Sequence, residues 1–207
     1  GWENKVEIGK GRSAGIEFMA QKTAGKTTGW LSYTLSKSDR KFTKGGINNG
    51  EWFPYKYDRR HSINLTINHK FSDRIDIGAS WVFYTGGTST IPEEKTTVIR
   101  PHNGANNGFL WYGTYDNTNS SPTIGDVSYI EHRNNFRLPA SHRLNLGVNF
   151  NKKTKHGMRT WNISLYNAYN AMNPAWVYRG HNKQGLSVIK KYTLLPLIPS
   201  FTYTYKF

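Results

Sequence analysis

The pattern G-x-S-x-G occurs at residues 11–15, which read GRSAG. That spacing surrounds the nucleophilic serine of many hydrolases, but the serine reacts only from a sharp strand-to-helix turn. Here the following residues, 16–21, alternate between apolar and polar types, which predicts a strand instead of a helix. We therefore interpret this motif as the opening of a strand and predict no catalytic residue and no enzyme activity.

Histidine is the other candidate for chemistry, and His102, His132, His142 and His181 lie in or beside predicted loops. Loops could gather them around a metal or haem, yet no pair has helical or Cys/His ligand spacing. The chain has no cysteine, which excludes disulfides and thiolate metal sites. We interpret these histidines as solvated and expect no metal and no cofactor.

Charge is strongly unbalanced, with 28 Lys and Arg against 13 Asp and Glu and a formal net charge of +15. Such an excess attracts anions, for which nucleic acid, anionic lipid headgroups and an acidic ligand are all candidates. The simplest interpretation places the charges on solvated loops. Residues 58–61 (DRRH) at a strand start predict an ion-paired girdle or interior wall, and residues 93–95 (EEK) are interpreted as solvated.

Aromatic and arginine residues of the predicted loops are the best candidates for ligand contact. Aromatic faces stack on sugars or rings, and arginines grip carboxylates or phosphates through two hydrogen bonds. Packing within the loops is an equally good interpretation of each. The candidates are Trp111, Tyr112, Tyr115, Arg133, Arg137, Trp176, Tyr178 and Arg179.

A period of two dominates the elements that must position these side chains. In HSINLTINHKF, from His61, Ile63, Leu65 and Ile67 share one face, opposite polar residues. Seven segments alternate in this way, and no segment has a convincing helical period. Their approximate ranges are 14–22, 27–36, 61–71, 74–84, 142–150, 159–169 and 200–207.

Composition fits strands of which only one face is apolar. The hydrophobic fraction is 36% and the mean hydropathy is −0.69. Aromatic residues reach 14%, too many for a disordered chain. No run approaches the ~20 apolar residues of a membrane helix, whereas ~9–11 residues of tilted strand cross a bilayer. We therefore predict an all-β fold, a transmembrane antiparallel β-barrel in which residues 1–207 form part of one domain.

Short and long connections alternate along the chain. Residues 23–26, 71–73 and 151–157 are predicted short turns, and 37–57, 86–141 and 179–185 are long connections. Outer-membrane barrels place short turns on the periplasmic side and long loops outside.

Prolines interrupt the last predicted hairpin at Pro174, Pro196 and Pro199. Above the interruption we expect residues 175–178 to pair with residues near 186–189 across the turn GHNKQG. Loop 86–141 is too long for a simple connector, so it either binds a ligand, folds over a lumen or forms a polar cap.

Several segments resemble late barrel strands of TonB-dependent outer-membrane receptors, most closely those common in Bacteroidota. They are GRSAGIEFMAQKTAGKTTGWLSYTLSKSDRKF, PYKYDRRHSINLT, the YTGG from Tyr84, SLYNAYNAMNPAWVY and the closing PSFTYTYKF. Each segment is mainly strand and turn chemistry, and their order and spacing together carry the resemblance.

The resemblance implies a barrel of about 22 strands around an N-terminal plug, of which this chain is the last seven strands. It implies import of a siderophore, cobalamin, glycan or peptide, driven by the TonB complex through the plug. It also implies residence in the cell outer membrane, with outer-membrane lipid and lipopolysaccharide, the rest of the receptor and, in some members, a surface lipoprotein lid as partners. Tyr203, Tyr205 and Phe207 match the family's terminal assembly signal.

Two other hypotheses stay open. A complete small barrel, such as an adhesin or membrane enzyme, needs an eighth strand from residues 1–8 or 124–134. A soluble basic nucleic-acid binder would use the +15 charge. We expect no nucleic-acid partner, because many aromatics are in line with aliphatic residues and not interleaved with Lys and Arg. The chain starts at Gly1 without a visible signal peptide, so we expect a processed protein or a fragment.

Overall fold

The structure, a computed structural model, describes residues 6–100 and 123–207. The described chain is all-β and antiparallel, with one short 3₁₀ segment, η2 (Ile47–Gly50). Among these residues no helix is long and apolar enough to span a membrane. Contacts divide the chain into two units, one comprising residues before 92 and from 132 onwards, the other comprising 92–131.

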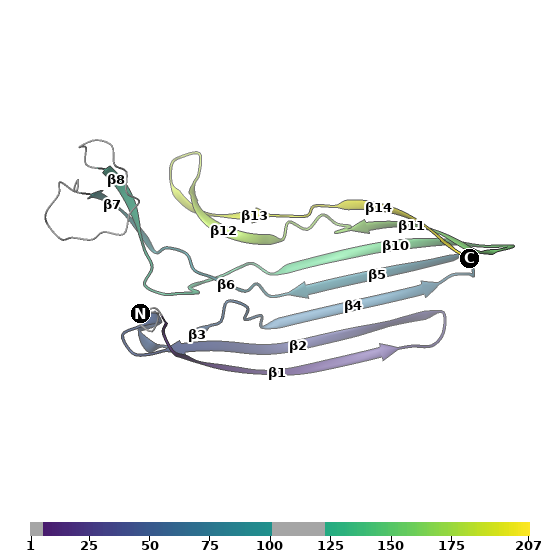
Figure 1. The fold of residues 1–207 in the computed structure, drawn as a ribbon, viewed down its shortest axis with the longest axis horizontal. Coiled ribbons are helices and arrows are strands. Elements are labelled where there is room, and N and C mark those ends of the chain that lie inside the picture. Colours follow the sequence, from purple (N-terminus) through teal and green to yellow (C-terminus); the bar gives the residue numbers. More distant parts are fainter. Residues whose placement is uncertain (1–5, 101–122) are drawn as a thin grey trace. The chain divides into compact units, whose positions relative to one another are not determined.

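The first unit contains a large sheet in which each main strand pairs with the next in the order β1-β2-β4-β5-β10-β11-β14 (Figure 1). Every pairing is antiparallel, and the short β3 (Phe53–Pro54) adds to the end of β2. The bounds are β1 Gly9–Lys22, β2 Thr27–Phe42, β4 His61–Lys70, β5 Ile75–Tyr84, β10 Ser141–Thr154, β11 Gly157–Tyr166 and β14 Ile198–Lys206.

The seven strands predicted from the period of two are confirmed, with differences at their ends. β2 continues six residues beyond 36 to Phe42, and β10 continues to Thr154, so the turn after it is only Lys155 and His156. β11 stops at Tyr166 instead of 169, because Asn167 adopts a left-handed φ of 54° and turns the chain.

The predicted sorting of connections is also confirmed. The three short turns, which follow β1, β4 and β10, lie at one end of the sheet together with the C-terminus (Figure 1). The longer connections, which follow β2, β5 and β11, leave the sheet at the opposite end (Figure 1). We call these the turn end and the loop end.

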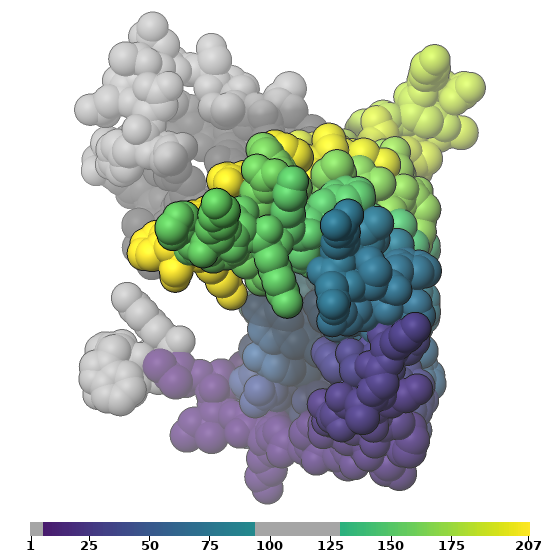
Figure 2. Space-filling model, turned by 90° about the vertical axis from the view of Figure 1, so that its right-hand side faces the viewer, coloured from purple at the N-terminus to yellow at the C-terminus, as the bar shows by residue number. Residues whose placement is uncertain are grey.

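Seen from the turn end, the strands follow one another as an arc from purple β1 to yellow β14 (Figure 2). β1 and β14 each pair on one side only, so the described strands form an open, curved sheet and no closed barrel.

Three two-stranded ladders lie off the large sheet. They are β12 (Pro174–His181) with β13 (Ser187–Thr193), β6 (Thr88–Ser89) with β9 (Phe136–Arg137), and β7 (Glu94–Arg100) with β8 (Thr123–Tyr129). β8 falls within the range considered for an eighth barrel strand, but it pairs with β7 alone. Residues 6–8 form no strand, and 1–5 lie outside the described residues.

The β12–β13 hairpin is present as predicted, but its predicted register was wrong. Tyr178 pairs with Lys190, not with the residues around 186–189. The turn forms later than expected because Asn182 closes it, its side chain accepting hydrogen bonds from the backbone N–H groups of Gln184 and Leu186.

Asn167 fixes the point where the chain leaves β11. It is 1% exposed, and its amide bonds to the backbone of Ala171 in both directions and to the carbonyl of Leu195. Asparagine combines these bonds with a left-handed φ more easily than other non-glycine residues.

Asn167→Gly keeps the backbone freedom and removes the amide, so we expect it to cost about 1–3 kcal/mol for the unsatisfied buried groups. Hydrogen exchange at the Ala171 amide should accelerate accordingly. Asn182→Gly, at the hairpin tip, is the control and should loosen only the tip. Unchanged protection of Ala171 in Asn167→Gly would show that the amide does not hold this turn.

Candidate functional site

The large sheet has one continuous apolar face. Residues directly opposite each other on neighbouring strands share a face, and the ladders place apolar residue beside apolar residue across all seven strands. This face comprises Ile16, Phe18 and Ala20; Leu31, Tyr33 and Leu35; Ile63, Leu65 and Ile67; Ile75, Ile77, Ala79, Trp81 and Phe83; Leu144, Leu146, Val148 and Phe150; Trp161, Ile163 and Leu165; and Phe201, Tyr203 and Tyr205.

This apolar face is not covered by the described chain. Phe53 and Ile91 are the buried hydrophobic residues of the described part, and neither lies on it. Along β11, Trp161 and Ile163 are 41% and 49% exposed, whereas the alternating residues Asn162 and Ser164 are half-buried. On β11 the apolar side chains are thus more exposed than the polar ones. This is the reverse of the pattern in a strand of a water-soluble protein.

The apolar band crosses the strands obliquely. On β2 its middle residue is Tyr33, which pairs with Ile63 of β4. On β11 its middle residue is Ile163, which the ladders connect through β10 and β5 to His69 of β4. Over four strand-to-strand steps the band therefore moves six residues along β4. At ~3.3 Å per residue and ~4.8 Å per strand, it crosses the strands at roughly 45°.

The opposite face is polar and internally bonded. Asp76 accepts hydrogen bonds of 2.7 Å from the side-chain amides of Asn149 and Asn151. Asn162 and Thr160, one strand further, donate to those two asparagines in turn, also at 2.7 Å. The face is therefore a wall of paired amides and hydroxyls, suited to contact with water or with a polar partner.

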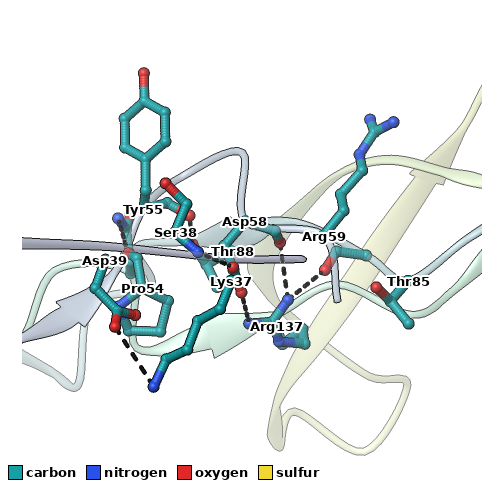
Figure 3. Close-up of polar contacts among 12 residues, drawn as sticks. Lys37, Ser38, Asp39, Pro54, Tyr55, Asp58, Arg59, Thr85, Thr88 and Arg137 are labelled. Atoms are coloured by element: carbon teal, nitrogen blue, oxygen red, sulfur yellow. Dashed lines mark hydrogen bonds and ion pairs between the residues drawn. The ribbon is translucent and has the colours of Figure 1, made fainter. Parts of the chain in front are cut away.

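An ion pair between the buried carboxylate of Asp58 and the partly exposed guanidinium of Arg137 organises the loop end, as Figure 3 shows. Arg137 donates to the Asp58 carboxylate at 2.6 Å and to the backbone carbonyls of Asp58 and Gly86 at 2.9 Å. The other carboxylate oxygen of Asp58 accepts from the Ser38 backbone N–H at 2.7 Å. The end of β2 and the chain near residues 58, 86 and 137, all far apart in sequence, meet around Asp58, whose side chain is 1% exposed.

Neighbouring charges at the loop end are paired as well. Asp39 bonds to Arg12 of β1 at 2.9 Å and to Lys37 at 3.4 Å. Arg59 points away from Arg137 (Figure 3). Its guanidinium lies over the Tyr84 ring, 3.9 Å from the ring centroid. The ion pairing predicted for residues 58–61 is therefore present at Asp58, with Arg137 as its partner.

The β12–β13 hairpin presents an aromatic surface. Trp176 stacks on Tyr192 across the hairpin, with ring centroids 4.2 Å apart and planes 12° apart. Tyr178 and its partner Lys190 share this face. The three rings are 45–48% exposed, so flat faces and a nearby cation are open to solvent. Such a surface suits a planar or sugar-like ligand with negative charge.

The structure brings together part of the predicted ligand set. Trp176 and Tyr178 share the hairpin face, whereas Arg179 lies on the other face of that hairpin, opposite Ile189. Arg137 makes the internal contacts just described, and the backbone of Arg133 bonds to the Asn48 side chain. Trp111, Tyr112, Tyr115 and His102 lie outside the described residues.

The structure also places the other residues that the sequence analysis singled out. Ser13 lies within β1 opposite Ser38, so the hydrolase-type motif forms no strand-to-helix elbow. Tyr203 and Tyr205 lie on the apolar face of β14, and Phe207 follows its end. His142 bonds to the Tyr169 hydroxyl at 2.8 Å.

Sequence reasoning missed Tyr192 and Lys190 of the hairpin face and did not identify Arg137 as the partner of Asp58. A hairpin register placed correctly from the Asn182 turn would have put Tyr192 opposite Trp176. No local signal pairs Asp58 with Arg137.

Comparison with known protein families, with curated proteins and with solved structures finds no match to this chain.

Proposed function

We propose that the large sheet is a segment of a transmembrane β-barrel in an outer membrane, with its apolar face against lipid and its polar face towards an aqueous interior. The exposed apolar face carries this proposal. Water-soluble monomers rarely expose contiguous apolar patches above a few hundred Å². In a bilayer, lipid chains would cover this apolar face, and its removal from water would be favourable. The polar face would contact water or a plug domain.

The oblique course of the apolar band supports the same proposal. Strands of outer-membrane barrels are tilted by roughly 35–45° from the membrane normal, so a band parallel to the membrane crosses them at roughly 45–55° to the strand axis. A soluble sheet packed on a second layer has no reason for such a band. The extensions of β1 and β2 beyond the band, with Arg12 paired to Asp39, fit strands that project into solvent.

The free edges of β1 and β14 support a larger barrel. Unpaired backbone groups within lipid cost several kcal/mol each, so both edges need partners. Both strands run towards the turn end, so an antiparallel closure between them is impossible. We therefore propose that further strands close the barrel, as in the TonB-dependent receptors that the sequence resembles.

On that resemblance, we propose that the complete protein is an energy-coupled receptor that imports a nutrient. The polar wall would then face the plug, through which the TonB complex acts. The loop end would face outwards, where Trp176, Tyr178 and the other predicted residues would contact a siderophore, cobalamin, glycan or peptide. A lipoprotein lid over the loops is a further partner of this proposal.

Tryptophan fluorescence tests the membrane assignment directly. Variants of the natural protein that retain a single tryptophan would be reconstituted in vesicles containing brominated lipids, which quench on contact. Trp81 and Trp161 on the apolar face are expected to be quenched strongly. Trp30, which points to the polar face of β2, is the matched control and should be quenched little. Equal quenching of Trp30 and Trp161 would contradict the proposal.

Import is tested separately in cells. Uptake of a labelled siderophore, cobalamin and oligosaccharides would be compared in cells with and without the protein, and with TonB removed. Uptake of one probe that requires both the protein and TonB is expected. Uptake that requires the protein but not TonB would favour a passive channel.

A further inference from the structure

Cationic side chains gather at the turn end of the large sheet. Those in or beside the three turns and the last strand are Lys22, Lys26, Lys70, Arg74, Lys152, Lys153, Lys155, Arg159 and Lys206. The two carboxylates at this end, Asp73 and Asp76, already have hydrogen-bonding partners. Lys70 lies 2.7 Å from Asp73, and its hydrogen bond lowers the pKa of that carboxyl, while Asp76 accepts from two asparagines.

Two of these cations lie on the apolar face itself. Lys152 follows Phe150 on β10, Arg159 precedes Trp161 on β11, and the ladder sets Lys152 directly opposite Arg159. Side chains in this arrangement have Cβ atoms about 5 Å apart. Tyr205 of β14 is opposite Arg159 and completes a row across three strands.

The row beside it is aromatic. Phe150, Trp161 and Tyr203 are register partners, and the Trp161 and Tyr203 rings lie 4.4 Å apart. On β10 and β11 the side chains of this face towards the turn end are therefore first aliphatic (Val148 and Ile163), then aromatic and then cationic. Aromatic belts mark the interface between hydrocarbon and headgroups in membrane proteins, so the cationic row falls at headgroup level.

Like charges directly opposite each other destabilise a sheet unless an anion lies between them. Among the described residues, no carboxylate forms an ion pair with Lys152 or Arg159. Resting on the membrane assignment above, we propose that Lys152, Arg159 and Tyr205 form a binding site for the phosphate of an anionic phospholipid in the leaflet at the turn end. The guanidinium and ammonium bind the phosphate oxygens, and the acyl chains lie along Trp161 and Tyr203.

The surroundings favour a lipid over a soluble anion. A free phosphate would gain only the two cations in an exposed site, where charge attraction is weak and screened by salt. A phospholipid adds contact between its acyl chains and the exposed apolar rows beside the cations. The cations also face the same side as those rows, whereas a partner protein in the aqueous interior would meet the other face.

Lipid binding can be measured on the natural protein in detergent. Phosphatidylglycerol, phosphatidylcholine and inorganic phosphate would be titrated separately, with bound lipid counted by native mass spectrometry. We expect preference for phosphatidylglycerol, little binding of phosphatidylcholine, and no competition by millimolar phosphate. Lys152→Gln combined with Arg159→Gln should weaken phosphatidylglycerol binding by roughly 30-fold, the effect of two headgroup-level cations.

Lys153→Gln combined with Lys206→Gln is the matched control, since it removes the same charge from adjacent positions on the opposite face. It should leave lipid binding nearly unchanged. An equal loss in the control, equal affinity for phosphatidylcholine, or displacement by phosphate or an acidic peptide would each overturn the site. If tryptophan fluorescence is quenched in bilayers as expected but the wild-type protein shows no lipid preference, that result would refute this site alone and leave the membrane assignment intact.

Discussion

Leu65→Arg is expected to prevent assembly of the sheet in a membrane, with a cost of about 2–4 kcal/mol near the bilayer midplane. Leu65 lies in the middle of the apolar run of β4, between Leu31 and Trp81 on the neighbouring strands. An arginine there must either desolvate its charge or distort the lipid around it. The fraction of heat-modifiable protein on unboiled gels and urea unfolding in vesicles both measure the loss.

Two further variants separate lipid from a protein core. Asn64→Arg, one residue away and opposite Ser32 and Val82, should be tolerated, because the membrane assignment places this polar face towards water. Leu65→Trp should also be tolerated, since lipid accommodates bulk that a packed core does not. A strong loss in Leu65→Trp would indicate that a protein layer covers this face and would contradict the membrane assignment.

The parts of the fold that could be predicted from sequence are those where one face of a strand meets a single environment throughout. β4 and β5 alternate between apolar and polar residues over most of their length, so their positions and facing residues could be predicted almost completely. β2 was predicted too short. Beyond Leu35 its face continues with Lys37 and Asp39, where both faces are polar and the period of two gives no contrast.

The candidate site could be predicted only in part, because its contacts are not local. Asp58 and Arg137 are 79 residues apart, and nothing near either one identifies its partner. Trp176 was singled out as an aromatic in a loop, but its stacking on Tyr192 depends on a register set by the Asn182 turn. Under the import proposal, the imported ligand would be selected by several loops together, and residues 101–122 of these loops lie outside the described residues.

The Asp58–Arg137 pair provides the second large effect. Arg137→Ala would leave a carboxylate that is 1% exposed with the Ser38 N–H as its remaining donor. Removing one partner of a buried ion pair costs about 3–5 kcal/mol, and we expect the lower end of that range because water can enter beside Arg137, whose side chain is 37% exposed. Faster proteolysis within residues 43–60 and faster hydrogen exchange at the Ser38 amide would report the loosened loop end.

A second substitution identifies which part of the pair causes the loss. Asp58→Asn removes the buried charge but keeps an oxygen that accepts from the Ser38 N–H. Added to Arg137→Ala, it should therefore recover about 1–2 kcal/mol, although alone, in the presence of Arg137, it should destabilise. If Asp58→Asn makes Arg137→Ala still less stable, the uncompensated charge is not the cause, and the hydrogen bonds of Arg137 to the Asp58 and Gly86 carbonyls hold the loop end instead.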